Sequence, residues 1–195
     1  MNTPNKLTLT RIILAPIFMF FFLEDSFQMR LIGLILFLIA ALTDLFDGYL
    51  ARKYAISTGF GKFMDPLADK ILVSSALISF VSLHYASPLP VMLIIGREFS
   101  ITGLRLLAAY RGALIPPSWW AKVKTFLQMT VVGVVMAYIF VITAIKDYGL
   151  HVPALESFDH LLWFNLLLWV TAVVTVWTGV DYGVKYFSMI KSVLK

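Results

Sequence analysis

The 195-residue sequence contains no cysteine, and only 14% of its residues are charged. The absence of cysteine excludes a disulfide framework, a thiolate metal site and a cysteine nucleophile. The charged residues are too few for the surface of a soluble domain, and the mean hydropathy is +0.87. The sequence also lacks the short alternating segments of a membrane barrel. These absences predict an all-α integral membrane protein.

The apolar stretches predict six transmembrane helices, each near the ~20 residues that cross a bilayer. They are expected over 5–23, 30–51, 66–85, 90–110, 123–145 and 160–182. Gly59 and Gly61 are expected in the turn before the third helix, with Pro66 in the first turn of that helix. No internal repeat or linker divides the chain, so residues 1–195 are expected to form a single transmembrane domain.

Lysine and arginine are distributed unevenly between the two predicted sides of the membrane. With six crossings, both termini share a side with the loops near 52–64 and 111–122, where most cations lie. The other side carries little beyond Arg30 and Lys146. Because cationic loops remain in the cytoplasm, both termini are expected there. The net charge of +5 suits anionic membrane lipids, and no basic cluster interleaved with aromatic residues indicates a nucleic-acid partner.

Four aspartates are the most informative residues, because a carboxylate near apolar membrane helices costs roughly 2.5–3.5 kcal/mol. Asp44 and Asp47 are three residues apart, and Asp65 and Asp69 are four apart, so each pair shares a helical face. Two such pairs facing each other would supply oxygen ligands for a hard divalent cation. Alternatively, the aspartates could form salt bridges with neighbours such as Lys70 and only hold helices together. The paired spacing of all four favours a metal site.

Small and basic residues beside the first aspartate pair suit a phosphate group. Gly48 and Ala51 share the helical face of Asp44 and Asp47, and they leave room for a ligand to approach the backbone. Arg52 adds a cation at the end of that face. The residue types therefore predict a site for a metal-bridged diphosphate.

The same segment resembles the signature of the CDP-alcohol phosphotransferase family, D-x2-D-G-x2-A-R-x8-G-x3-D-x3-D. The eight signature positions are Asp44, Asp47, Gly48, Ala51, Arg52, Gly61, Asp65 and Asp69. The resemblance implies six transmembrane helices with a polar active-site cavity at the cytoplasmic side. It also implies attack of an alcohol on the β-phosphorus of a CDP-linked donor, with release of CMP.

The resemblance further implies a role for each site residue. Asp44, Asp47, Asp65 and Asp69 would bind two divalent ions, Mg²⁺ or Mn²⁺, which hard oxygen ligands suit. Asp69 would also be the catalytic base that accepts the proton of the acceptor hydroxyl. The implied CDP-binding residues are Asn5, Thr8, Asp44, Gly48, Ala51, Arg52 and Gly61. A homodimer in a bacterial cell membrane is implied as well.

Basic residues in the second half of the chain indicate an acceptor that itself carries a phosphate. Glu98 and Arg105 are seven residues apart and share a helical face, and Arg105 is expected within or near the end of a span. Lys122 and Lys124 are expected in the hydrated segment that opens the fifth helix. The predicted acceptor-phosphate residues are Arg105, Arg111, Lys122 and Lys124.

Four further motifs resemble the subgroup of the family that makes phosphatidylglycerophosphate. Three are Arg97-Glu98, Gly103-Leu104-Arg105 and Lys122-x-Lys124-Thr125-x-x-Gln128-Met129, with Ala121 where the subgroup usually has glycine. The fourth is the opening Pro4-Asn5-x-Leu7-Thr8-x-x-Arg11, which the resemblance places near the nucleotide. This resemblance implies CDP-diacylglycerol as donor and sn-glycerol 3-phosphate as acceptor. The alternatives are an inositol-phosphate-using or cardiolipin-forming phosphotransferase, a cation transporter, and a prenyltransferase, although a prenyltransferase usually needs a second aspartate motif.

Overall fold

A computed structural model of the chain describes residues 3–54, 59–112, 116 and 118–186. Within its helices, the side chains of residues 3–6, 44–54, 59–63 and 156 lie outside the description. All regular structure in the described part of the chain is helical. The helices are α1 (Thr3–Leu23), α2 (Phe27–Tyr54), α3 (Gly59–Ser82), α4 (Pro88–Tyr110), α5 (Trp119–Asp147), α6 (Pro153–Glu156) and α7 (His160–Lys185).

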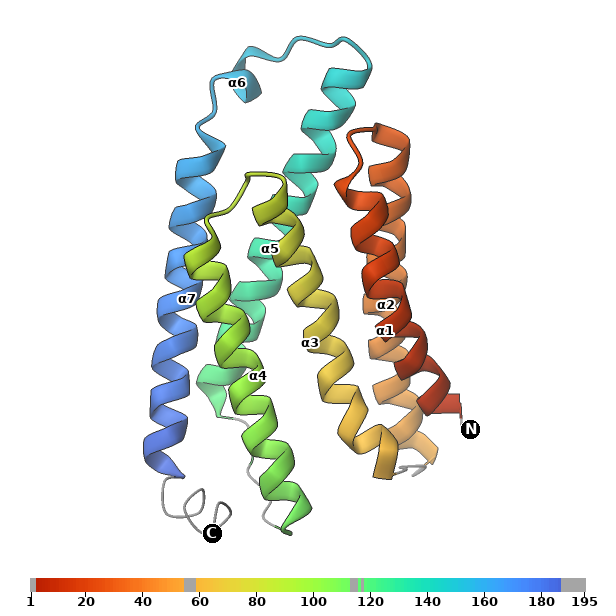
Figure 1. The fold of residues 1–195 in the computed structure, drawn as a ribbon, viewed down its shortest axis with the longest axis vertical. Helices are drawn as coiled ribbons and strands as arrows, with labels where there is room; N and C mark the ends of the chain where they lie inside the picture. Colours follow the sequence, from red (N-terminus) through yellow and green to blue (C-terminus); the bar gives the residue numbers. More distant parts are fainter. Residues whose placement is uncertain (1–2, 55–58, 113–115, 117, 187–195) are drawn as a thin grey trace.

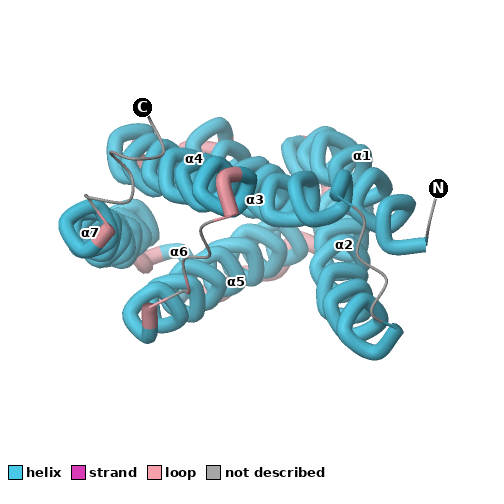
Figure 2. Tube along the Cα trace, turned by 90° about the horizontal axis from the view of Figure 1, so that it is seen from below, coloured by secondary structure: helices cyan, strands magenta, loops and turns pink. Residues whose placement is uncertain are grey.

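The long helices form an antiparallel bundle (Figure 1). The beginnings of α1, α3 and α5 lie toward the same end of the bundle as the ends of α2, α4 and α7, at the bottom of the view. α1 packs against α2 and α3, α3 contacts α4, and α7 packs against α4 and α5. Figure 2 shows this arrangement along the bundle, with α3 between α1 and α4. The bundle therefore brings α3, α4, α5 and α7 together around one end.

The beginning of α3 differs from the sequence prediction. Gly59 and Gly61, which were expected in a turn, belong to α3, and Pro66 lies inside this helix instead of in its first turn. The apolar pattern marks only the part of a helix that contacts other apolar groups. A helix that has already formed continues through polar residues at little cost, because each added residue contributes another hydrogen bond.

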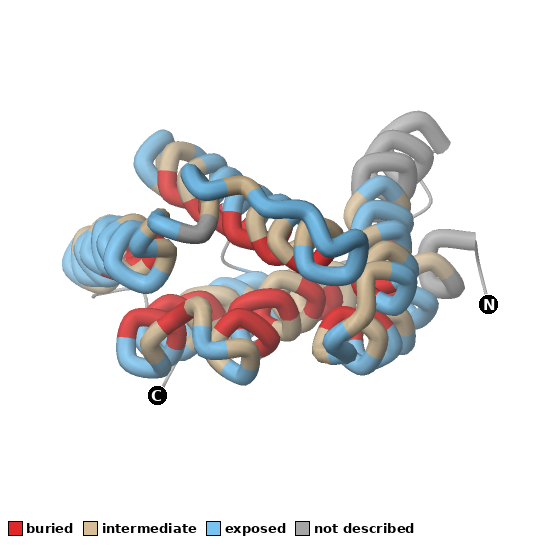
Figure 3. Tube along the Cα trace, turned by 90° about the horizontal axis from the view of Figure 1, so that it is seen from above, coloured by how far each residue is buried: buried red, intermediate tan, exposed pale blue. Residues whose placement is uncertain are grey.

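The buried residues face the inside of the bundle, whereas the outer faces remain exposed (Figure 3). Phe18 and Phe22 from α1, Phe80 from α3 and Leu168 from α7 belong to one apolar core. Large apolar side chains such as Phe20 are exposed on the outside. Such an apolar outer surface is characteristic of a protein that contacts lipid.

Two described helices, α5 and α7, are long and apolar enough to cross a membrane. Shorter apolar stretches occupy 7–23 in α1 and 27–43 in α2. The all-helical architecture and these apolar helices are those of a membrane protein. This agrees with the composition of the chain.

Candidate active site

A cavity of about 450 Å³ lies between α3, α4, α5 and α7, at the end of the bundle where α1 begins. Its lining combines acidic and basic side chains. Asp65 and Asp69 come from α3, Arg105 comes from the last turns of α4, and Lys124 comes from the second turn of α5. The cavity thus joins two groups of residues that are far apart in the sequence.

The two aspartates of α3 lie one helical turn apart and are partly buried. Each accepts a hydrogen bond from a buried side chain of α1. The hydroxyl of Thr8 donates to Oδ1 of Asp65, and Nη1 of Arg11 donates to Oδ1 of Asp69. α1 therefore fixes the orientation of both carboxylates at the cavity wall.

The contact of Arg11 with Asp69 was not predicted, although Thr8 and Arg11 share the opening motif, are spaced by three residues and lie on one helical face. Arg11 is only 1% exposed. A buried arginine requires a carboxylate or another acceptor close by. The spacing of Arg11 from Thr8 was the available sign that both residues contact the aspartate site.

The structure describes the other predicted site residues of the first half of the chain by their backbone. The side chains of Asn5, Asp44, Asp47, Gly48, Ala51, Arg52 and Gly61 lie outside the described residues. The backbone assigns 44–52 to the last part of α2 and Gly61 to the first turn of α3. Within the side chains that are described, no group of three or more histidines and acidic residues could hold a metal ion.

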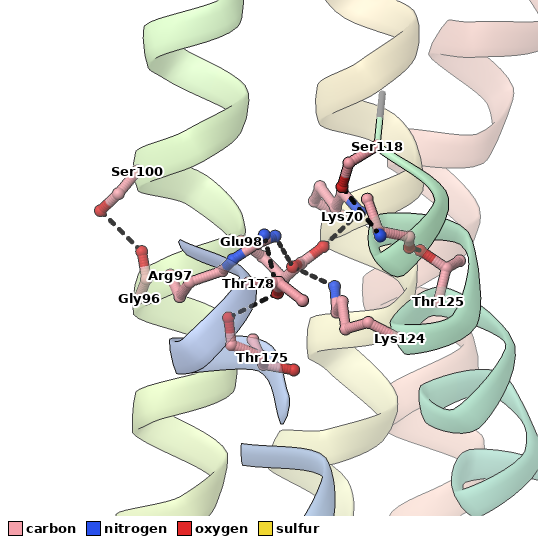
Figure 4. A network of polar contacts seen from close by, with 11 residues as sticks. Lys70, Gly96, Arg97, Glu98, Ser100, Ser118, Lys124, Thr125, Thr175 and Thr178 are labelled. Atoms are coloured by element: carbon pink, nitrogen blue, oxygen red, sulfur yellow. Dashed lines mark hydrogen bonds and ion pairs between the residues drawn. The ribbon is translucent and has the colours of Figure 1, made fainter. Parts of the chain in front are cut away.

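A buried carboxylate forms the centre of a cluster of cations at the cavity (Figure 4). Glu98 of α4 is 3% exposed and accepts hydrogen bonds from Lys70 of α3 and Lys124 of α5. Nη1 of Arg97 is 2.9 Å from Oε1 of Glu98, and Nη2 of Arg97 donates to Oγ1 of Thr178 over 3.1 Å. With three cations and one carboxylate, this cluster has a net charge of +2.

Only two of the four cations predicted to bind the acceptor phosphate line the cavity. Arg105 and Lys124 line the cavity, whereas Arg111 and Lys122 are exposed and are not part of its lining. The expectation of a hydrated Lys124 is wrong, because this residue is 1% exposed. The reason is that α5 begins at Trp119, where Oγ of Ser118 accepts a hydrogen bond from the backbone N–H of Ala121, 3.2 Å away. Lys124 consequently lies in a regular second turn that faces the bundle.

Lys70, Arg97 and Glu98 belong to the cavity, but the sequence did not identify their contacts with one another. Lys70 was considered as a salt-bridge partner of the aspartates, whereas its carboxylate partner among the described residues is Glu98. A glutamate within an apolar stretch requires buried cations as partners. This requirement was the only sign in the sequence that Glu98 would gather them.

The chemistry of the cavity follows from the charged groups in its lining. Asp65 and Asp69 of α3 supply carboxylate oxygens, and the guanidinium and ammonium groups come from α3, α4 and α5. Carboxylates suit hard divalent cations, and cationic side chains suit phosphate groups. The fold and the cavity define a helical membrane protein that handles phosphorylated compounds at one end of its bundle.

Comparison with known proteins places the chain in a family. A family model described as CDP-alcohol phosphatidyltransferase matches residues 1–177, so the chain belongs to the CDP-alcohol phosphatidyltransferase family. This confirms the family that the aspartate signature indicated.

Three curated relatives carry the same name, CDP-diacylglycerol–glycerol-3-phosphate 3-phosphatidyltransferase. The chain is 40% identical to the protein of Bacillus subtilis over 204 aligned positions, which cover 98% of each chain. It is 37% identical to that of Rickettsia bellii over 181 positions, or 93% of each chain. Identity to the Haemophilus influenzae protein is 34% over 185 positions, covering 93% of this chain and 91% of the relative.

Proposed function

We propose that this protein transfers the phosphatidyl group of CDP-diacylglycerol to sn-glycerol 3-phosphate, giving phosphatidylglycerophosphate and CMP. Family membership supports this activity, as do relatives of that name that align over nearly their full lengths. The observation that carries the proposal is the shared cavity of Asp65, Asp69, Arg105 and Lys124. A metal-bridged diphosphate and a phosphorylated acceptor need these two kinds of residue in one place.

The donor set fits a divalent ion. A carboxylate has two oxygens with about four acceptor directions, so the hydrogen bond from Thr8 leaves Asp65 able to bind a metal. Asp44, Asp47, Asp65 and Asp69 are the proposed ligands of two ions, Mg²⁺ or Mn²⁺. When bound, such ions neutralise the diphosphate of the donor and stabilise charge on the departing CMP.

In the proposed reaction, the protein supplies binding, orientation and proton transfer. Arg105 and Lys124 bind the acceptor phosphate, with Arg111 and Lys122 adding positive potential at the surface. Asp69 accepts the proton of the terminal acceptor hydroxyl, whose oxygen forms a bond to the β-phosphorus. The bond between that phosphorus and the bridging oxygen breaks, and CMP leaves with the bonding electrons.

The CDP part of the donor is proposed to lie beside the signature segment. Asn5, Thr8, Asp44, Gly48, Ala51, Arg52 and Gly61 are the proposed contacts. The segment comprises the last turns of α2 and the first turns of α3, and α1 packs against both helices. This position would deliver the diphosphate to Asp65 and Asp69 at the cavity wall.

We further propose that the six long helices cross a bacterial cell membrane, with both termini in the cytoplasm. The cavity then opens on the cytoplasmic side, where sn-glycerol 3-phosphate is dissolved. The acyl chains of the donor remain in the bilayer while its headgroup enters the cavity. The apolar outer faces of the bundle and the excess of cations near the termini support this orientation. The active form is proposed to be a homodimer.

The proposed activity is tested with the purified protein in detergent, using CDP-diacylglycerol and one acceptor at a time. We expect CMP release and a new lipid with sn-glycerol 3-phosphate, but not with inositol 1-phosphate or phosphatidylglycerol. Turnover should stop in excess EDTA and return with Mg²⁺ or Mn²⁺. Preference for another acceptor would support a different phosphotransferase, and the absence of any metal-dependent CMP release would support the transporter alternative.

A further inference from the structure

α7 contributes one wall of the cavity and packs closely against Arg97 of α4. Thr178 and Tyr182 lie about one helical turn apart, line the cavity and are 3% and 8% exposed. Between them, Gly179 allows Arg97 of α4 to approach the helix, because a Cβ atom there would lie only 3.1 Å from Cγ of Arg97. α7 therefore packs closely against the cation cluster, with Thr178 hydrogen-bonded to Arg97.

The two hydroxyl groups on this wall differ in their hydrogen bonding. Oγ1 of Thr178 accepts from Arg97 and donates to the backbone carbonyl of Thr175, 2.9 Å away. The buried hydroxyl of Tyr182 has no hydrogen-bond partner among the described residues. Buried hydroxyls in native proteins nearly always have a partner, because an unpaired one has lost its hydrogen bonds to water. A buried hydroxyl without a partner among the described residues points to a hydrogen bond with a molecule bound in the cavity.

Other neutral polar groups on the cavity wall are already satisfied. Oγ of Ser118 caps α5, and Oγ1 of Thr125 donates to the backbone carbonyl of Ala121. Thr102 is only partly buried, so water can reach it. Within the described part of the cavity, Tyr182 is thus the neutral, deeply buried group that still requires a hydrogen bond.

We propose that Tyr182 determines acceptor specificity by hydrogen bonding to the central hydroxyl of the acceptor. This inference rests on the proposed function. A three-carbon acceptor has a phosphate, which Arg105 and Lys124 suit, and a terminal hydroxyl, which reacts beside Asp69. Its central hydroxyl is neutral and can both donate and accept a hydrogen bond, so a hydroxyl on the protein is a suitable partner. The phenol of Tyr182 is such a partner, and it faces the same cavity.

The test compares Tyr182→Phe with the wild type on two acceptors. The first is sn-glycerol 3-phosphate, and the second is propane-1,3-diol monophosphate, which lacks only the central hydroxyl. A neutral hydrogen bond contributes enough that its loss should lower kcat/KM for sn-glycerol 3-phosphate about tenfold. The value for the second acceptor, or its inhibition constant, should change less than about twofold, because that molecule never makes the contact.

Tyr186→Phe is the matched control. Tyr186 lies one turn further along the chain and its ring contacts that of Tyr182 at an angle of 50°, with ring centroids 5.0 Å apart, but it does not line the cavity. This variant should keep the wild-type preference between the two acceptors. Without acceptor, Tyr182→Phe should have a Tm equal to or above that of the wild type, because it removes an unpaired buried hydroxyl.

Three results would overturn the inference. Equal losses on both acceptors would assign the phenol to the phosphate or to general positioning, and no loss on either would remove it from the acceptor site. A lowered Tm for Tyr182→Phe would mean that the hydroxyl is paired within the protein. If the wild type itself does not use sn-glycerol 3-phosphate, the proposed function fails, and this outcome is distinct from the other three.

Discussion

Glu98 contacts cationic side chains from three helices, namely Lys70 of α3, Arg97 of α4 and Lys124 of α5. All of these helices line the cavity, so this one carboxylate positions much of its basic wall. The cluster has an excess of positive charge, because the single carboxylate of Glu98 pairs with three cations. The remaining positive charge is what an acceptor phosphate would neutralise.

We expect Glu98→Gln to destabilise the protein and to reduce its activity. Glutamine has nearly the same shape but no charge, so three cations would remain close together without a counterion. Removing one partner of a buried ion pair typically costs about 3–5 kcal/mol, which a lowered Tm in detergent would report. Glu24→Gln is the control, since Glu24 is exposed. An unchanged Tm for Glu98→Gln would contradict a central role for this carboxylate.

Asp69 is placed to act on the acceptor, because it lines the cavity and is oriented by Arg11. Asp69→Asn keeps the shape of the side chain but cannot accept a proton. Turnover should fall by about 10²–10⁴-fold, the usual contribution of a general base. Binding of CDP-diacylglycerol should change little if proton transfer is the main role. Asp181→Asn is a suitable control, because Asp181 pairs with Lys185 and does not line the cavity.

If Asp69→Asn instead abolished donor binding, Asp69 would be chiefly a metal ligand. Near-normal kcat would exclude it from both roles.

At the scale of helices, the close contact between α1 and α2 depends on one glycine. A Cβ atom at Gly33 would lie 3.0 Å from the backbone nitrogen of Phe22 and 3.1 Å from its Cβ atom. Backbone atoms cannot move aside as a flexible side chain can. Any larger residue at this position must therefore separate the two helices.

Gly33→Ala should lower the free energy of unfolding by about 1–3 kcal/mol, as overpacking of a filled interior usually does. Gly133→Ala is the matched control in α5, since a Cβ atom there would meet nothing within 4 Å. The control should be neutral or slightly stabilising, because alanine favours helix more than glycine does. Equal melting temperatures for the two variants would argue against the tight α1–α2 contact.

The positions of the long helices could be predicted from the sequence because apolar stretches of about 20 residues are a strong local signal. The polar ends of these helices could not be predicted, because the apolar pattern does not indicate how far a helix continues beyond its apolar contacts. The beginning of α3 is an example. Asp65 and Asp69 could be found from their spacing. The burial of Lys124 and its contact with Glu98 depend on how α4 and α5 pack, and this packing has no local signature.

At the scale of the whole molecule, a second group of charges lies at the opposite end from the cavity. Asp25, between α1 and α2, pairs with Lys146 near the end of α5, with 2.5 Å between Oδ2 and Nζ. Nη2 of Arg30 lies 3.4 Å from Oδ1 of Asp25. This cluster attaches the α1–α2 hairpin to α5, and it contains none of the residues proposed for catalysis.

The hydrogen bond from Lys146 is the main cause that lowers the pKa of Asp25 below its usual value. A carboxyl with a lowered pKa in the folded state stabilises that state above its unfolded pKa of about 3.9. The stabilisation is lost as the pH falls from there through the lower folded value. We expect a decrease in Tm in this pH range that is small, because the side chains of Asp25 and Lys146 are both exposed. The decrease should be absent from Asp25→Asn. Identical pH profiles for the two proteins would contradict this role.

The central claim is that the acceptor phosphate binds in the same cavity that holds Asp65 and Asp69. Arg105 and Arg111 provide an internal comparison, because only Arg105 lines that cavity although both are exposed arginines at the end of α4. The most direct measurement is the KM of Arg105→Ala and of Arg111→Ala for each substrate. A misfolded variant would lose both substrates alike, so a selective change reports binding.

Arg105→Ala should raise the KM for sn-glycerol 3-phosphate about 10–100-fold, the loss expected for a charge-assisted contact with phosphate. Its KM for CDP-diacylglycerol should stay within about threefold of the wild type. Arg111→Ala should change the KM for either substrate by no more than about threefold. An unchanged acceptor KM in Arg105→Ala, or an equal rise for both substrates, would contradict the account.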